Sequence, residues 1–156
     1  MIVVEGTIRG KQRPRFNTKT GRAFTSNQTI NYENWVKQCY IEQSNKLLQG
    51  PIRARKEIYY SVPKSYSKRK IEAIKNYEDN PMKKPDCDNV VKIVLDSLNK
   101  IAYDDDKQVV ELTVLKRWTF DNERIEFEME EIKWKKNYVS MYGYLKEIKW
   151  YITILV

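Results

Sequence analysis

The chain has 156 residues, of which 41% are hydrophobic and 32% charged, a length and balance that fit one globular domain and exclude a disordered chain. Histidine is absent, which excludes the serine, cysteine and zinc mechanisms that need an imidazole and leaves acid–base or metal chemistry to Asp, Glu, Lys, Tyr or Cys. With 29 Lys and Arg against 21 Asp and Glu, the net charge is +8, which favours a polyanionic partner, nucleic acid first and an anionic membrane surface second.

The first half of the chain predicts two strands and two helices around a basic loop. Apolar and β-branched runs predict strands, and Gly50-Pro51 is a strong helix stop. In chain order we expect a strand over residues 2–8, a basic loop over 10–22, a helix from Asn27 or Thr29 to about Leu48, a strand over 57–62 and a short basic helix over 67–77.

The second half predicts a helix followed by two strands. Apolar residues recur at spacings of three and four through residues 88–101, which predicts a helix with one buried stripe. An acidic turn follows at residues 104–106, and strands are expected over 109–118 and 124–132, joined as a hairpin through Asp121-Asn122. The order indicates an α+β fold: a single domain in which a mixed β-sheet packs with helices.

We expect a domain over residues 1–134 and a basic, aromatic C-terminal extension over 135–156. The extension is interpreted as a surface addition that packs on the domain, with a dimer or DNA contact as the alternative. Cys39 and Cys87 form no CxxC pair, and the N-terminal residues lack a signal-peptide pattern, so we expect a cytoplasmic protein. We expect neither a membrane partner nor a small-molecule cofactor.

Acidic side chains gather around the start of the predicted helix at residue 88. Asp86 and Asp88 are two residues apart, which places both carboxylates on one side of an extended stretch. Lys92 and Asp96 follow at successive helical turns, on the face opposite the apolar stripe. The turn at residues 104–106 leads into a strand whose path can return these acids to the first pair.

Each of these residues also has a purely structural interpretation. Asp88 can be a helix N-cap, Lys92 and Asp96 an ordinary surface pair, and Asp104, Asp105 and Asp106 a solvated turn. If the acids converge, their repulsion requires a cation, and an all-oxygen site suits Mg²⁺ or Mn²⁺. Such a site on a basic protein fits a nuclease, in which the metal activates water and stabilises charge on the phosphate.

These motifs resemble the RusA-type Holliday junction resolvases of bacteria and their phages. The resemblance covers roughly residues 2–132 and rests on the segments PDCDN (85–89), Lys92, DSL (96–98) and DDKQV (105–109), with RPRF (13–16) as a weaker match. It implies a RusA-like fold and a Mg²⁺-dependent homodimer that nicks two opposed strands of a four-way DNA junction, and it suggests a phage or prophage source.

The resemblance also assigns roles by motif position. Asp86, Asp88 and Asp106 match the metal-binding carboxylates of the family, with Asp105 in support, and Lys92 matches its essential lysine. The additional Asp104 before this pair leaves the register of the acidic turn open.

Basic side chains outside the motif are the expected DNA contacts. The residues that we select are Lys11, Arg13, Arg15, Lys19, Arg22, Lys68, Arg69, Lys83 and Lys84. Two other functions stay open on the sequence: a non-catalytic DNA-binding or recombination accessory protein, and a nuclease with broader branched-DNA specificity.

Overall fold

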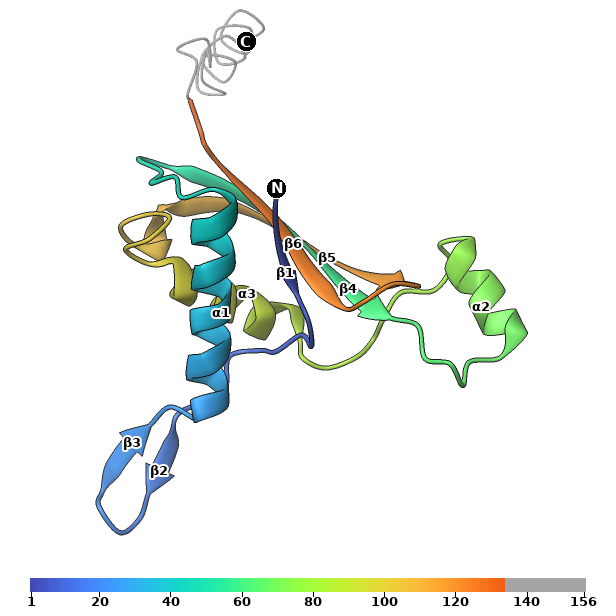
Figure 1. Cartoon of the computed structure of the whole chain (residues 1–156), viewed down its shortest axis with the longest axis horizontal. Helices are drawn as coiled ribbons and strands as arrows, with labels where there is room; N and C mark the ends of the chain where they lie inside the picture. The colour runs from blue at the N-terminus through green and yellow to red at the C-terminus, as the bar shows by residue number, and fades with distance from the viewer. Residues whose placement is uncertain (134–156) are drawn as a thin grey trace, which may run out of the picture.

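The computed structural model describes residues 1–133 as one mixed four-stranded sheet with helices packed on one face (Figure 1). The predicted extension over residues 135–156 lies outside the described residues. The sheet order is β1-β6-β4-β5, formed by β1 (Ile2–Glu5), β6 (Arg124–Glu131), β4 (Ile52–Ser61) and β5 (Val109–Thr119). The predicted α+β class is confirmed.

Strand β4 is the centre of the sheet and shows why the sheet has two different faces. It pairs parallel with β5 and antiparallel with β6, and its alternate residues from Ile52 to Tyr60 are buried, as the period of two in a strand requires. The opposite face is polar and carries ion pairs, among them Arg53 with Glu111 and Glu130. The core therefore lies on one side of the sheet only.

Helices α1 (Asn27–Gln43) and α3 (Cys87–Leu98) cover the apolar face and share one core with β1, β4 and β6. The apolar stripe predicted for α3 is buried, including Val90, Val94 and Leu98. The short helix α2 (Lys68–Lys75) lies beyond the end of β4, away from α1 (Figure 1). None of the helices in residues 1–133 is long and apolar enough to cross a membrane.

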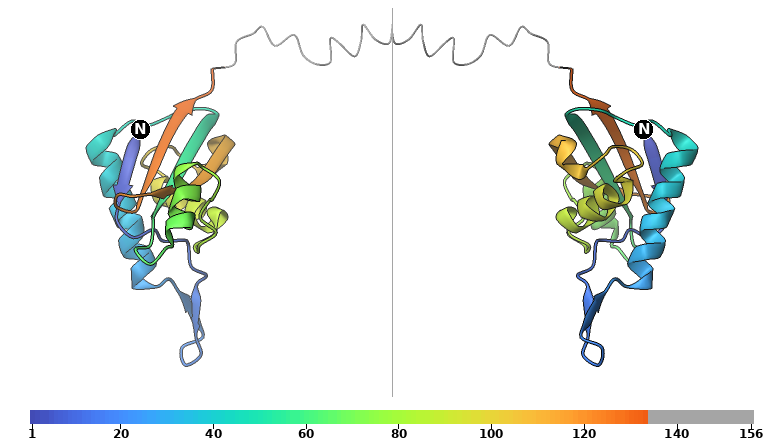
Figure 2. Two further views of the ribbon diagram at one scale, coloured as in Figure 1. Left: turned by 90° about the vertical axis from the view of Figure 1, so that its right-hand side faces the viewer. Right: turned by 90° about the vertical axis from the view of Figure 1, so that its left-hand side faces the viewer.

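Two expectations about strands are wrong. Strands β5 and β6 do not pair with each other as a hairpin, because β4 lies between them and bonds to both. The segment expected to be an irregular basic loop contains a second, two-stranded sheet formed by β2 (Arg15–Asn17) and β3 (Arg22–Phe24). This small hairpin projects from the body in both views of Figure 2.

The helix ends differ from the expected ones by a few residues. Ser26, not Asn27 or Thr29, is the N-cap of α1, and its hydroxyl accepts a hydrogen bond from the backbone N–H of Thr29. The helix ends at Gln43, before residue 48. Helix α2 begins after the N-cap Ser67, close to the predicted start. Cys39 and Cys87 are both free.

Candidate active site at the start of helix α3

The N-terminus of α3 presents two exposed carboxylates. Asp86 occupies the N-cap position, yet its side chain forms no capping hydrogen bond, and Asp88 lies in the first turn, where the helix dipole stabilises an anion. Asp88 is therefore not the N-cap. Since a capping aspartate normally accepts a bond from the helix backbone, the Asp86 carboxylate is left available for another ligand.

A pocket of about 420 Å³ opens beside these acids, between the N-terminal loop and the start of α3. Gly10, Lys84, Asp86 and Asn89 are among the residues that line it. The loop touches the helix closely, because a Cβ on Gly10 would lie 2.8 Å from that of Pro85 and 2.9 Å from that of Asn89. The backbone N–H of Lys11 donates to the carbonyl of Asn89 at 2.8 Å.

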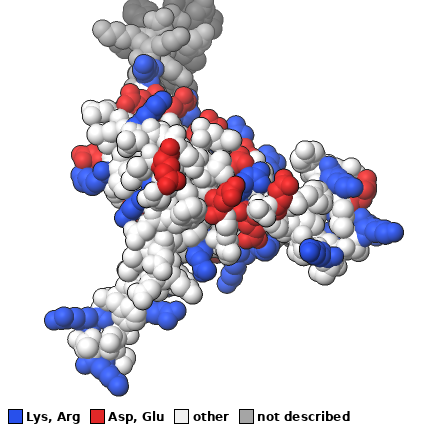
Figure 3. All heavy atoms as spheres, in the orientation of Figure 1, with Lys and Arg blue, Asp and Glu red and all other residues white. Residues whose placement is uncertain are grey.

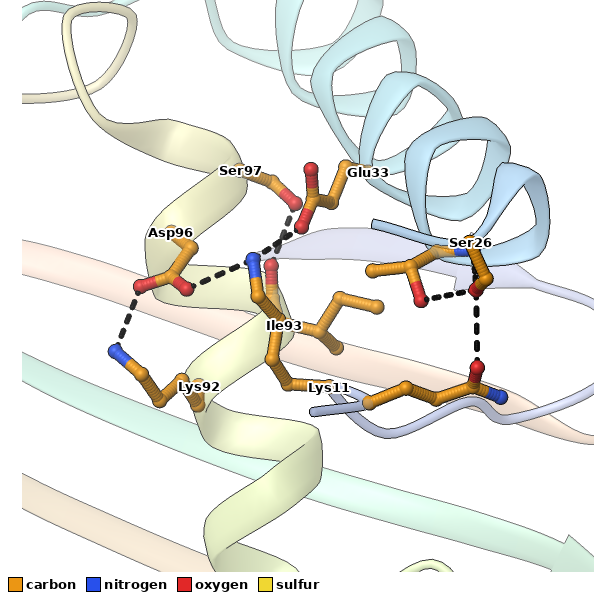
Figure 4. A network of polar contacts seen from close by, with 9 residues as sticks. Lys11, Ser26, Glu33, Lys92, Ile93, Asp96 and Ser97 are labelled. Atoms are coloured by element: carbon orange, nitrogen blue, oxygen red, sulfur yellow. Dashed lines mark hydrogen bonds and ion pairs between the residues drawn. The ribbon is translucent and has the colours of Figure 1, made fainter. Parts of the chain in front are cut away.

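The Asp96 carboxylate bridges two lysines further along α3 (Figure 4). Lys92 donates to one oxygen at 3.1 Å, and Lys11 lies 3.0 Å from the other. Lys11 also binds Glu33 of α1. Lys92 and Asp96 do form the i,i+4 pair of the structural interpretation, but the pair is part of a network that joins the N-terminal loop to both helices.

This network perturbs the titration of its members. Burial opposes the charge of Lys11, but hydrogen bonds to Glu33 and Asp96 outweigh it and raise the lysine's pKa. Burial likewise opposes the charge of Asp96, but hydrogen bonds from Lys11 and Lys92 lower the pKa of the carboxyl. Both groups are therefore held in their charged forms.

The three carboxylates of the acidic turn have different partners. Asp104 is exposed and pairs with Lys100 at 2.6 Å. Asp105 caps the short helix η1 (Asp106–Gln108) by accepting a bond from the N–H of Lys107 at 3.0 Å. The half-buried Asp106 forms no ion pair within residues 1–133. Of the turn's acids, Asp106 is thus the one left for a ligand.

The buried Tyr103 immediately precedes the acidic turn. The carboxylates of Asp106 and Asp96 both act on Tyr103, whose pKa is raised by burial first and by these two charges next. The Tyr103 hydroxyl donates to the carbonyl of Leu95 in α3 at 2.8 Å. The tyrosine therefore ties the acidic turn to the helix that carries the other acids.

The carboxylates nevertheless do not gather into a single cluster within residues 1–133. Within residues 1–133 no three Asp, Glu or Cys side chains lie close enough together to hold a metal ion. Two carboxylates 4 Å apart repel by about 4 kcal/mol at an effective dielectric of 20, so separation is the stable arrangement for bare acids. The donor set at α3 and η1, composed of carboxylate oxygens, fits Mg²⁺ or Mn²⁺ in chemistry.

The basic residues selected from the sequence fall into three positions. The hairpin carries exposed Arg13, Arg15, Lys19 and Arg22, none of which forms an ion pair in the described part of the chain, while Lys68 and Arg69 are exposed on α2. Figure 3 shows the basic hairpin and α2 on opposite sides of a body of mixed charge. Lys84 lines the pocket and Lys83 pairs with Glu123 at 3.2 Å.

The sequence did not reveal the internal role of Lys11. This lysine was selected as a DNA contact, but the structure pairs it with two carboxylates. Glu33 was missed altogether, because it is 22 residues from Lys11 and the sequence shows only one acid among many polar residues of a predicted helix.

Comparison with known proteins identifies the family of the chain. The family model described as Endodeoxyribonuclease RusA matches residues 5–130, and the chain belongs to this family. The chain is also 39% identical over 88 residues to the uncharacterized protein YqaN of Bacillus subtilis (strain 168), a match that covers 55% of this chain and 61% of that protein.

Proposed function

We propose that the protein is an endodeoxyribonuclease that resolves four-way DNA junctions, depends on Mg²⁺ or Mn²⁺ and acts as a homodimer. The observation that carries this proposal is the Asp86 side chain, which occupies a cap position without capping the helix. Membership of the RusA endodeoxyribonuclease family supports the same conclusion.

In this proposal Asp86, Asp88 and Asp106 hold the metal ion. Asp105 supports them by fixing the turn that presents Asp106. When bound, the ion supplies a water nucleophile at neutral pH and stabilises the charge that develops on the phosphate. Asp86 and Asp88 lie at a helix N-terminus, where the helix dipole favours the negative charge that a metal ligand needs.

Lys92 is the proposed cationic contact to the scissile phosphate. Its side chain is 61% exposed and lies one helical turn after Asp88, so it can reach a strand that crosses the start of α3. Asp96 holds the ammonium group at 3.1 Å and thereby limits the positions that it samples. A fixed cation at this place stabilises negative charge in the transition state.

The basic surface of the protein and the symmetry of a four-way DNA junction both support such a junction as the substrate. Exposed basic residues on the hairpin and on α2 suit a phosphate backbone. A four-way junction is approximately two-fold symmetric and needs two incisions, which a C2 dimer with two equivalent sites supplies.

The test is a cleavage assay on an immobile four-way junction beside its linear duplex, a flap and a fork. It compares Mg²⁺ with EDTA, and the wild type with Asp88→Asn and the control Asp121→Asn, which changes an exposed acid outside α3 and the acidic turn. Paired symmetric nicks in the junction alone, lost in EDTA and in Asp88→Asn but kept in the control, are expected. Equal cutting of flaps and forks would instead establish a broader branched-DNA nuclease.

One observation favours a second candidate, a non-catalytic DNA-binding or recombination accessory protein. The described residues do not bring three acids together, as a purely structural use of these carboxylates would allow. A metal-binding protein should gain thermal stability in Mg²⁺ or Mn²⁺, and Asp86→Asn should remove that gain. Tight junction binding without cleavage in either metal would favour the accessory protein.

A further inference from the structure

The hairpin of residues 13–24, here called the arm, has a defined tip. Strands β2 and β3 pair through Phe16 and Ala23, and the backbone N–H of Gly21 donates to the carbonyl of Asn17 at 2.9 Å. The Asn17 side chain accepts from the N–H of Lys19 at 2.9 Å. Gly21 has a φ of 67°, a left-handed conformation that glycine adopts without strain.

The arm exposes two phenylalanines that the body of the protein does not cover. Phe16 is 65% and Phe24 49% exposed. Because Phe16 is paired with Ala23 and Phe24 with Arg15, the two rings lie on opposite faces of the hairpin. An isolated two-stranded hairpin is marginal in water, so large exposed rings on it indicate a binding partner rather than a contribution to the fold.

The charge of the arm determines which partner fits. Arg13, Arg15, Lys19 and Arg22 lie in the arm, and the sequence has no acidic residue between Glu5 and Glu33. A partner must therefore offer dense negative charge together with flat apolar surfaces. Unpaired or unstacked bases in nucleic acid offer both, since aromatic side chains stack on bases while arginines contact phosphates.

The base of the arm is fixed next to the candidate active site. The Ser26 hydroxyl donates to the side-chain oxygen of Gln12 at 2.9 Å across the two ends of the hairpin (Figure 4). One residue earlier, the N–H of Lys11 binds the carbonyl of Asn89, next to Asp88 in the first turn of α3. A DNA strand held at the base of the arm would therefore pass close to the carboxylates.

We infer that the arm is the element that recognises the branch point, with Phe16 and Phe24 stacking on bases that are unstacked where the DNA arms separate. The inference rests on the proposed function, because a four-way junction places such bases beside intact duplex at its branch point. It assigns junction specificity to the arm, whereas general affinity for DNA comes from the basic side chains.

The experiment measures the affinity of the full chain for a four-way junction and for linear duplex of the same sequence, in EDTA so that no strand is cut. The variants are Phe16→Ala and Phe24→Ala, and the control is Phe120→Ala, which removes a ring of similar exposure, 62%, outside the arm. Each arm variant should lose about tenfold or more in junction affinity and less than about twofold in duplex affinity. The control should change neither affinity.

Conservative replacements separate stacking from simple apolar contact. Phe16→Tyr keeps a flat ring and should retain junction affinity, whereas Phe16→Leu keeps apolar area without a ring and should lose it. A 2-aminopurine placed at the branch should change in fluorescence with the wild type and with Phe16→Tyr only.

The outcomes that contradict the two proposals are distinguishable. A wild type that does not prefer the junction to the duplex would contradict the proposed function itself. A wild type that prefers the junction, together with arm variants that keep the preference, would overturn only the role of the arm. Loss of a dimer in Phe16→Ala by sedimentation velocity would assign the arm to a second copy of the chain, and arm-dependent binding to anionic vesicles would assign it to a membrane; either overturns the inference.

Discussion

At the residue scale, the Asp96 carboxylate pairs with two lysines of the candidate site, Lys11 and Lys92. Its carboxyl lies within 3.1 Å of Lys92 and 3.0 Å of Lys11, and these bonds lower its pKa from 3.8 against the opposing effect of burial. Stability that depends on a lowered carboxyl pKa is complete above 3.8 and is lost as the pH falls through the lower, folded-state value.

We predict that Asp96→Asn lowers the free energy of unfolding by about 1 kcal/mol at pH 7. The difference from the wild type should shrink as the pH falls below 3.8, because the wild-type carboxyl then also becomes neutral. Urea unfolding at pH 7 and at acid pH measures both values. The exposed pair of Arg53 and Glu111 supplies the control Glu111→Gln, which should matter less; an equal effect would contradict a special role for Asp96.

Lys56 is an unusual residue in the middle of β4. Its side chain is fully buried, and its Nζ has no hydrogen-bond partner among the described residues. Val114 and Phe127 are its neighbours across the sheet. Burial lowers the pKa of Lys56 from 10.5 to about 7, and at 1.4 kcal/mol for each unit such a shift corresponds to a penalty on the order of 5 kcal/mol.

We predict that Lys56→Met stabilises the protein by a few kcal/mol at pH 7. The unfolded lysine titrates near 10.5 and the folded one near 7, so the penalty is complete below pH 7 and disappears as the pH rises toward 10.5. The advantage of the methionine variant should therefore shrink between pH 7 and 10 in chemical denaturation. Lys75→Met, at an exposed position of α2, should change little, and a less stable Lys56→Met would contradict the prediction.

At the scale of elements, the loop that leads into the arm meets the start of α3 at Gly10, a residue without a side chain. Gly10 lies against Pro85 and Asn89 so closely that an added Cβ would come within 2.8 and 2.9 Å of them. Both contacts are Cβ atoms close to the backbone, so neither can rotate away. The loop would have to move off the helix, and the bond from the Lys11 N–H to Asn89 would lengthen.

We predict that Gly10→Ala destabilises the protein by about 1–3 kcal/mol and reduces junction cleavage, because the arm shifts relative to the carboxylates. Thermal unfolding and the junction assay measure the two effects. Gly21→Asn is the matched control, since asparagine tolerates the left-handed φ of 67° and a Cβ there meets nothing within 4 Å. Wild-type stability and cleavage in Gly10→Ala would show that the contact is not needed.

The sequence predicts elements well where one local signal dominates. Pro85 and the apolar stripe place α3 within a residue at its start. Strand pairing is harder to predict. The turn after Thr119 shows that β5 and β6 follow one another in the chain, but it does not indicate which strands lie side by side in the sheet. Strand β4, which precedes α2 and α3 in the chain, takes the place between β5 and β6 and pairs the backbone N–H and C=O groups along both of its edges.

Some features of the candidate site could likewise be predicted from the sequence, and others could not. Asp86, Asp88, Lys92 and Asp106 are candidates chosen by their positions in the motif, and the structure adds which carboxylates are already engaged. The bridge from Lys11 to Glu33 and Asp96 depends on three segments that only the fold brings together. The hairpin in the basic segment was missed because its strands are only three residues each.

At the scale of the whole molecule, charge is distributed in two distinct ways. On the open face of the sheet, Arg53 and Arg55 are neutralised by neighbouring glutamates. On the arm, Arg13, Arg15, Lys19 and Arg22 lack such partners within residues 1–133. The positive field that attracts DNA should therefore come from the arm and from α2, while the sheet face contributes little.

The salt dependence of binding tests this distribution directly. On duplex DNA each phosphate contact adds about 0.9 to the slope of log affinity against log salt concentration, so replacing all four basic residues of the arm by glutamine should reduce the slope by about 3 to 4. Replacing Arg53 and Arg55 by glutamine should leave it unchanged, because their charges are already balanced by glutamates. A titration of fluorescent duplex at several salt concentrations in EDTA measures both slopes. Equal reductions per charge in the two variants would mean that the net charge of the molecule, and not the arm, governs its attraction to DNA.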